Sequence, residues 1–134
     1  MPSLKSIVFS KCCLVLGMLI AAPSARSDWM MVDANDDAAV LVLLSDYLSQ
    51  SPKANLTFLM NFNAPIKHIG REFNSSVNMA EVDCQNLRYK VVGFKNYSEP
   101  MGQGQITFQT EKPAAWKKVF AGTIEFSLWK VACE

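Results

Sequence analysis

The sequence predicts an α+β fold: an antiparallel sheet of about six strands with a C-terminal helix that is tied to the sheet by one disulfide. Apolar and polar residues alternate with a period of two along several short segments, which is typical of half-buried strands. The last residues instead space their apolar side chains as on one face of a helix. Two cysteines lie beyond the N-terminal region, Cys84 and Cys133, and an even count indicates a disulfide in an exported protein.

The N-terminus has the features of a secretory signal peptide. The start of the chain carries Lys5 and Lys11 and no acid, and residues 12–22 form an apolar run shorter than the roughly 20 residues that span a bilayer. Small residues follow this run. We therefore expect a cleaved signal peptide of residues 1–27, a domain of residues 28–134, and no transmembrane helix in the mature chain.

The charge balance of the expected domain argues against nucleic acid as a partner. Residues 28–134 hold ten basic and twelve acidic side chains, whereas binding to phosphates needs a basic excess. The charge is unevenly spread, with a net of −5 over residues 28–84 and of +3 over residues 85–134. This division hints at a bipolar surface.

Alternation and turn residues place the strands. The expected strands cover residues 29–34, 39–44, 55–62, 76–84, 87–95 and 105–111. Residues 35–38 are rich in Asn and Asp and predict a tight turn between the first two strands. The alternation slips near Ala80, which indicates a β-bulge. We expect residues 45–54 to form a loop or a short extension, and residues 63–74, which contain a proline and a glycine, to form a loop with some extended structure.

The C-terminal segment predicts the helix. Thr123 is a suitable N-cap, and Glu125 lies in the first turn, where the helix dipole favours an acid. Phe126, Trp129 and Cys133 are spaced as one face of a helix, which would turn Cys133 towards the sheet and Cys84. A bridge between these cysteines closes a loop of about 50 residues and would contribute roughly 4 kcal/mol to stability.

The residues that carry catalytic or metal chemistry do not form a recognisable site in the sequence. His68 is the one histidine, and no GxSxG or HExxH motif accompanies it, so we expect a surface histidine in a loop. Asp36 and Asp37 form an acidic doublet, which we interpret as solvated turn residues. We expect no enzyme activity, no cofactor and no metal.

A short basic cluster lies near the C-terminus. Lys117 and Lys118 follow Trp116, and Lys112 is close by. The cluster could contact an acidic partner or a polysaccharide, but a solvated loop is the simpler interpretation.

Residues 97–105, YSEPMGQGQ, interrupt two strand-like segments with Pro100, Gly102 and Gly104. A hairpin loop explains these residues, since glycine adopts backbone angles that other residues avoid. A ligand-binding loop is the alternative, because exposed loops on a rigid sheet often carry binding residues.

The order of these features resembles the bacterial surface-adhesin protein E family. The shared features are Cys84, the loop of Tyr97, Ser98, Met101, Gly102 and Gly104, then Trp116, Trp129 and the closing Cys133. The resemblance implies a small exported protein in which Cys84 pairs with Cys133. It also implies a structural loop at residues 97–105. The same five residues are the candidate binding loop under the alternative that an exposed loop on a rigid sheet carries binding.

The same resemblance implies a function in binding host matrix and serum proteins at the bacterial surface, with a homodimer as an open possibility. One departure is clear: Cys12 and Cys13 precede the apolar run, so the lipidation motif of surface lipoproteins is missing. The alternative is therefore a soluble periplasmic protein that binds or inhibits an envelope component, or a small ligand held between the sheet and the helix.

Overall fold

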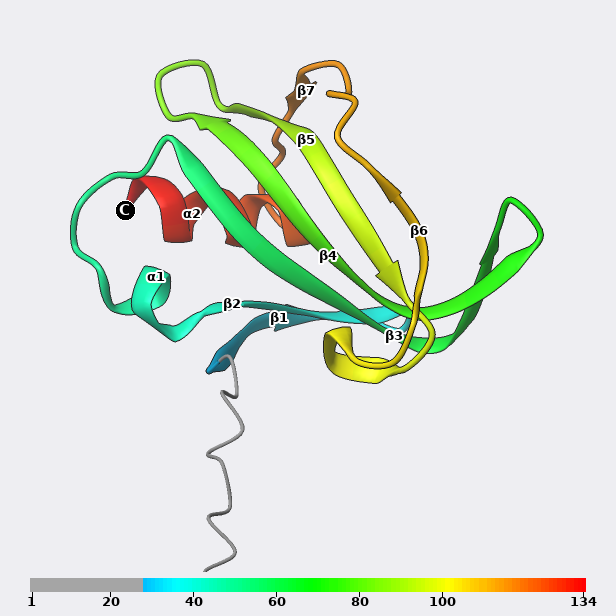
Figure 1. The fold of residues 1–134 in the computed structure, drawn as a ribbon. Helices are drawn as coiled ribbons and strands as arrows, with labels where there is room; N and C mark the ends of the chain where they lie inside the picture. Colours follow the sequence, from blue (N-terminus) through cyan, green and yellow to red (C-terminus); the bar gives the residue numbers. More distant parts are fainter. Residues whose placement is uncertain (1–27) are drawn as a thin grey trace, which may run out of the picture.

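Residues 28–134 are the part of the chain that the computed structural model describes, and they form one antiparallel sheet with a C-terminal helix (Figure 1). The predicted signal peptide, residues 1–27, lies outside the described residues. The strands are β1 (Trp29–Ala34), β2 (Ala38–Leu43), β3 (Asn55–His68), β4 (Arg71–Asp83), β5 (Arg88–Tyr97), β6 (Ile106–Thr110) and β7 (Lys117–Lys118). The helices are α1 (Leu44–Leu48), the short 3-10 helix η1 (Pro100–Gly102) and α2 (Ile124–Cys133).

The strands follow one another across the sheet. Each strand from β1 to β6 pairs antiparallel with the next in the chain, and β7 pairs with the start of β5. The predicted α+β class, with an antiparallel sheet and a C-terminal helix, is confirmed. The tight turn between the first two strands is also confirmed, because the side chain of Asn35 accepts hydrogen bonds from the backbone of Asp37 and Ala38.

The predicted loop over residues 63–74 is wrong, because β3 continues to His68 and β4 begins at Arg71. The two strands are joined by Ile69 and Gly70, which both have positive φ, as a two-residue hairpin turn requires. The pairing of β3 with β4 breaks between Asn61 and Ile66. Pro65, which has no N–H to donate, lies in this break, and it masked the strand pattern in the sequence.

The prediction of a loop or a short extension over residues 45–54 is also incomplete, because the helix α1 occupies Leu44–Leu48. A helix of five residues is little more than one turn, so it leaves no apolar periodicity to recognise. No helix in residues 28–134 is long and apolar enough to cross a membrane.

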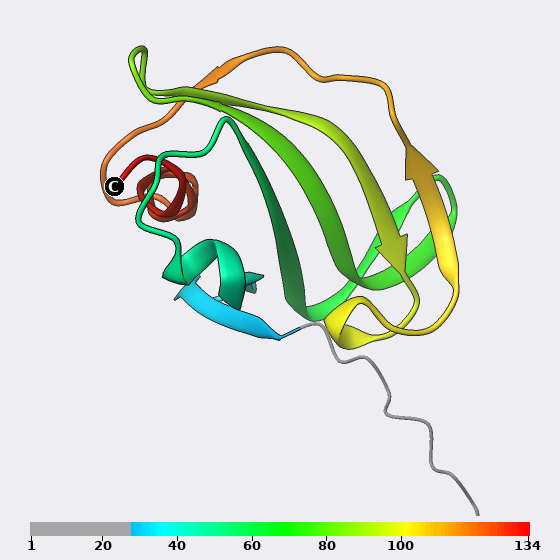
Figure 2. The ribbon, with the colours of Figure 1, turned by 60° about the vertical axis from the view of Figure 1, so that its left-hand side comes forward.

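The sheet bends strongly, and Figure 2 shows α2 nearly end-on against one of its faces. Ladder irregularities cause much of this shape, because bulges bend and twist strands. The predicted irregularity near Ala80 is confirmed between Met79 and Ala80. We name the side that α2 covers the helix face and the other side the loop face, since the loop containing η1 packs there.

The core lies between α2 and the helix face. It contains the buried side chains of Val40, Val42, Leu56, Phe58, Ala80, Leu128 and Ala132. The most buried stripe of α2 is thus Leu128 and Ala132, whereas we expected Phe126, Trp129 and Cys133 to face the sheet. Both sets have helical spacing, so periodicity could not choose between them. Trp129 lies on the flank of α2, and its indole donates a hydrogen bond of 3.3 Å to the carbonyl of Asp83.

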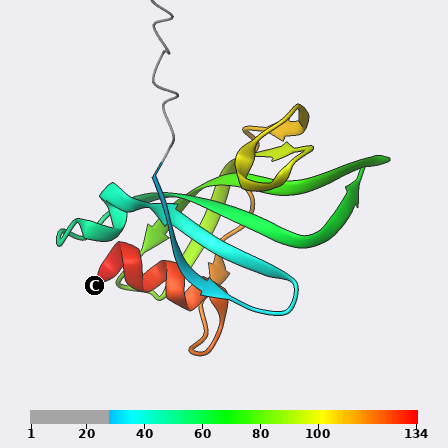
Figure 3. The same ribbon diagram turned by 90° about the horizontal axis from the view of Figure 1, so that it is seen from below.

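The helix is held at both ends as predicted. Thr123 is the N-cap, and its hydroxyl accepts a hydrogen bond from the backbone N–H of Phe126 at 3.2 Å. At the other end the predicted disulfide joins Cys84, just after β4, to Cys133, with Cα atoms 5.6 Å apart. α2 also lies beside β1 (Figure 3). The hydroxyl of Ser127 donates there to the carboxylate of Asp33 at 2.7 Å.

The turn after β4 is organised by Asp83, which the sequence did not single out. Its carboxylate accepts hydrogen bonds from the backbone of Gln85, from the backbone and side chain of Asn86, and from the Arg88 guanidinium. The side-chain amide of Asn86, and next the guanidinium of Arg88, lower the pKa of Asp83 from 3.8 to about 2. This turn therefore fixes the backbone on which Cys84 presents its sulfur.

Replacing both cysteines by serine should lower the melting temperature by about 10 °C or more, because the loss of a bridge that contributes roughly 4 kcal/mol shifts a small domain by this amount. Differential scanning calorimetry of the wild type and of the Cys84→Ser/Cys133→Ser variant measures the effect. An unchanged transition, together with a titratable thiol in the wild type, would contradict the structural role of the bridge.

Acid should weaken the fold through Asp83. A carboxyl whose pKa is lowered on folding contributes stability above its unfolded pKa, and this contribution is lost as the pH falls from 3.8 to about 2. The melting temperature of the wild type should fall over this window more steeply than that of Asp83→Asn. Asp36→Asn, in an exposed turn, is the control and should keep the wild-type slope. Equal slopes for the wild type and Asp83→Asn would contradict this role.

Candidate functional site

The helix face is only partly covered, and a groove opens beyond the N-terminus of α2. It has a volume of about 740 Å³. Three segments form its walls: the turn between β1 and β2, the bend of β3 near Pro65, and the first residues of α2. Met60, Phe62, Ile66 and Ile124 supply apolar side chains to its lining. The groove is therefore a concave surface with apolar patches, a type of surface that commonly binds ligands or partner chains.

The walls of the groove are held by polar contacts. Asn63 donates from its side-chain amide to the carbonyl of Asp36 at 2.8 Å, and from its backbone to the carbonyl of Asp37 at 2.9 Å. These bonds join the β1–β2 turn to the bend of β3. The carboxylates of Asp36 and Asp37 are exposed, as the sequence predicted for turn residues. The fold adds that both residues line the groove.

The groove is acidic. Among the described residues that line it are the carboxylates of Asp33, Asp36, Asp37 and Glu125, but no lysine, arginine or histidine. Glu125 also acts on a neighbour: burial, and next the negative charge of Glu125, raise the pKa of the Tyr89 phenol. Carboxylates from a strand, a turn and a helix are thus gathered around one apolar surface, and the fold brings Glu125 to the three aspartates from about 90 residues away in the sequence.

A smaller recess of about 240 Å³ adjoins the groove on the helix face. Three phenylalanines line it: Phe62 and Phe73 pack edge to face with ring centroids 5.5 Å apart, and Phe94 is the third. One cationic residue, Lys67, lines it as well. Asn78 and Asn96 are buried and line the recess as well, Asn96 with only 3% of its surface exposed. Strand register explains this mixture, because Asn78 lies directly opposite Phe94.

The expectation of a surface histidine in a loop is wrong. His68 is the last residue of β3 and lines the recess, and its ring packs edge-on against Phe108 with centroids 4.7 Å apart. Its Nδ1 atom is buried and has no hydrogen-bond partner. The sequence could not show this environment, because Phe94 and Phe108 reach His68 only once β3, β5 and β6 lie in one sheet.

The candidate binding loop lies on the loop face, between β5 and β6, where the sequence predicted a hairpin. The hydroxyl of Ser75, which is fully buried, donates to the carbonyl of Glu99 at 2.6 Å and accepts from the N–H of Gly102 at 2.8 Å. The side-chain amide of Asn74 donates to the carbonyl of Ser98 at 2.6 Å. These contacts fasten the loop to β4.

Close packing explains the two glycines of the loop. Both adopt positive φ, and a Cβ on Gly102 would lie 3.2 Å from Leu59. A Cβ on Gly104 would collide with the hydroxyl of Ser98, the same hydroxyl that accepts a hydrogen bond from Gln105. Tyr97 ends β5 and is half-buried, whereas Met101 is exposed. The loop is therefore well ordered by its contacts, and its part in binding stays a prediction.

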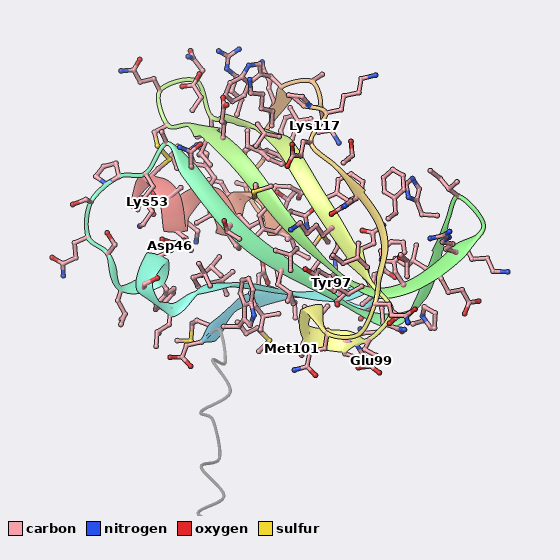
Figure 4. All side chains as sticks on the ribbon, in the orientation of Figure 1. Asp46, Lys53, Tyr97, Glu99, Met101 and Lys117 are labelled. Carbon is pink, nitrogen blue, oxygen red and sulfur yellow. A yellow bond between two sulfur atoms is a disulfide. The ribbon has the colours of Figure 1, made fainter. Side chains whose placement is uncertain are left out.

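The basic cluster lies at the other end of the sheet. Figure 4 shows Lys117 well away from Glu99 and Met101 of the loop. Trp116 is 38% exposed, and the Arg88 guanidinium and the Lys90 ammonium lie 4.6 and 4.8 Å from the centroid of its ring. Cation–π contact thus explains why Trp116 is ordered in a segment that is otherwise exposed. Within residues 28–134, no three His, Cys, Asp or Glu side chains gather as metal ligands would.

Removing the hydroxyl of the buried Ser75 should destabilise the protein by about 1–3 kcal/mol, because the carbonyl of Glu99 and the N–H of Gly102 lose their partner. Chemical denaturation of Ser75→Ala measures this loss. Ser76→Ala is the matched control, since Ser76 is also buried but lies on the helix face. Equal losses for the two variants would show that Ser75 does not anchor the loop.

Comparison with known proteins agrees with these features. A search of curated protein sequences gives no match. A family model does match, over residues 29–134, which is almost the whole of the described chain. It is the model for surface-adhesin protein E, and the match includes the disulfide, the β5–β6 loop and the groove. The chain belongs to the surface-adhesin protein E family.

Proposed function

We propose that this chain is an exported binding protein of the bacterial envelope, which holds a protein partner in the groove on the helix face. Family membership supports an adhesin-like, surface-related role in protein binding. The observation that carries the proposal is the groove itself, an open concave surface with apolar lining on a sheet whose other face carries its own loop. Protein interfaces are commonly built around such apolar centres with polar rims.

A non-enzymatic role fits the surroundings of His68. A catalytic histidine is normally oriented by a hydrogen bond on one ring nitrogen and faces a nucleophile or a substrate proton with the other. Here Nδ1 has no partner and the ring packs against Phe108 and Phe94. This arrangement favours a packing or recognition role for His68.

The location is part of the proposal. A signal peptide at residues 1–27 would export the chain, and without a lipidation motif the protein would stay in the periplasm or reach the surface by association with another envelope component. We favour the surface, with host matrix or serum proteins as partners, because the family is one of surface adhesins. The β5–β6 loop is a secondary contact in this proposal, through its exposed Met101, and a homodimer is compatible with it.

A second candidate is a soluble periplasmic protein that binds an envelope component or a small ligand. The size of the groove, about 740 Å³, favours it, because small-molecule sites commonly measure about 300–1,000 Å³. The space between the sheet and α2 is much less suitable. The cavity there, beside Phe58, Tyr89 and Leu128, measures about 10 Å³. A small ligand would therefore bind in the groove, beyond the end of the helix.

Protease digestion of intact cells, compared with cells whose outer membrane is permeabilised, tests the location. The proposal predicts digestion on intact cells. Protection until permeabilisation would exclude surface adhesion and leave the periplasmic candidate.

Binding to immobilised matrix and serum proteins tests the groove. Ile66 lines the groove and is 37% exposed, whereas Ile69, at the tip of the same hairpin, is 71% exposed and is not among the lining residues. Ile66→Gln should weaken binding severalfold, and Ile69→Gln is the matched control that should bind like the wild type. If both variants bind like the wild type, the partner does not use the groove.

A further inference from the structure

We propose that the groove receives a positively charged polypeptide segment, which places one large aromatic side chain in the adjoining recess. The inference rests on the proposed function and specifies the chemistry of the partner. Three features carry it: the shared lining of groove and recess, the charge around the groove, and the unusual polar lining of the recess.

The groove and the recess adjoin on the helix face and share part of their lining. Met60, Phe62 and Ile66 line both, so a segment that lies in the groove reaches the recess without leaving the helix face. The larger part can hold backbone and several side chains. The smaller part, with about 240 Å³, has room for one large side chain.

The charge around the groove selects a cationic segment. Its four carboxylates come from β1, the β1–β2 turn and α2, and within the described residues none of them forms a salt bridge. The two salt bridges of the described chain join Asp83 to Arg88 and Glu81 to Lys90, outside the groove. Lysine or arginine side chains of a partner would meet carboxylates that have no cationic partner, although that of Asp33 already accepts a hydrogen bond from Ser127. An acidic segment would be repelled.

The recess selects an aromatic side chain that has a polar group. Phe62, Phe73 and Phe94 provide aromatic contact surface, and Asn96 and His68 are polar residues of the same lining. The Nδ1 atom of His68 has no partner and is itself buried, so a ligand atom reaches it only if the ring turns towards the recess. A buried polar atom without a partner is costly, and a ligand that supplies the partner removes this cost. Tryptophan fits both demands, since its indole is large and apolar and carries one N–H donor.

The test uses labelled synthetic peptides and fluorescence anisotropy with the purified protein. The first peptide alternates lysine and glycine around a central tryptophan. One counterpart has glutamate in place of every lysine, and another has alanine in place of the tryptophan. We expect the lysine–tryptophan peptide to bind, the glutamate peptide to show no binding, and the alanine peptide to bind at least tenfold more weakly, as the loss of a buried aromatic anchor implies.

A matched pair of protein variants places the binding in the groove. Asp36→Asn/Asp37→Asn/Glu125→Gln neutralises three groove carboxylates, and Asp28→Asn/Asp46→Asn/Glu111→Gln makes the same change in net charge outside the groove. The groove variant should bind the lysine–tryptophan peptide roughly tenfold more weakly, because each exposed ion pair contributes modestly and three add up. The control variant should bind within about twofold of the wild type. Equal weakening in both variants, or equal binding of the lysine and glutamate peptides, overturns the inference.

A competing occupant is a second copy of this chain, whose Lys117 and Lys118 could meet the groove of its neighbour. Light scattering of the wild type and of the groove variant decides this point. A wild-type dimer that dissociates in the groove variant would overturn the peptide assignment in favour of self-association.

Failure of the inference is distinguishable from failure of the proposed function. Matrix-protein binding that depends on Ile66 but is insensitive to the three carboxylates would overturn only the inference, whereas protection of the protein on intact cells would overturn surface adhesion.

Discussion

The packing of one short helix against one part of a much longer sheet determines the rest of this structure. α2 has ten residues and spans about 15 Å, whereas β3 has fourteen and would span about 46 Å if it were straight. The helix cannot cover the whole face. The disulfide between Cys84 and Cys133 holds its C-terminal end beside the β4–β5 turn, so the uncovered part of the face lies beyond its N-terminal end.

The two faces of the sheet are covered in different ways: the β5–β6 loop packs on one face, and α2 packs on part of the other. On the loop face, Ser75 and Asn74 bind the backbone of the β5–β6 loop, and Gly102 lets that loop approach Leu59 and Val77 closely. On the helix face, the aromatic side chains beyond α2 pack against one another and against His68, and they leave a recess. Apolar surface that the chain leaves uncovered on the helix face is a natural site for a partner.

The fold places the charged groups at separate sites, with an acidic groove at one and a basic cluster at another. Three of the acidic residues of the first half, Asp33, Asp36 and Asp37, line the groove with Glu125 of the second half. Lys117 and Lys118 lie at the β7 end of the sheet. Such separation steers a charged partner before contact and sets its orientation. It contributes more to the rate and specificity of association than to raw affinity.

The sequence by itself determined the fold class, most strands, the turn at residues 35–38, the N-cap Thr123, the pairing of the two cysteines and the family. All of these depend on local patterns, on a count of cysteines or on the order of a few residues. The tertiary structure alone decided that β3 passes through Pro65 to His68, that Leu128 and Ala132 face the sheet, and that a groove and a recess exist. The reason is physical: a bulge at Pro65 and the pairing of distant strands determine which side chains share a face, and neither has a local signature strong enough to be recognised.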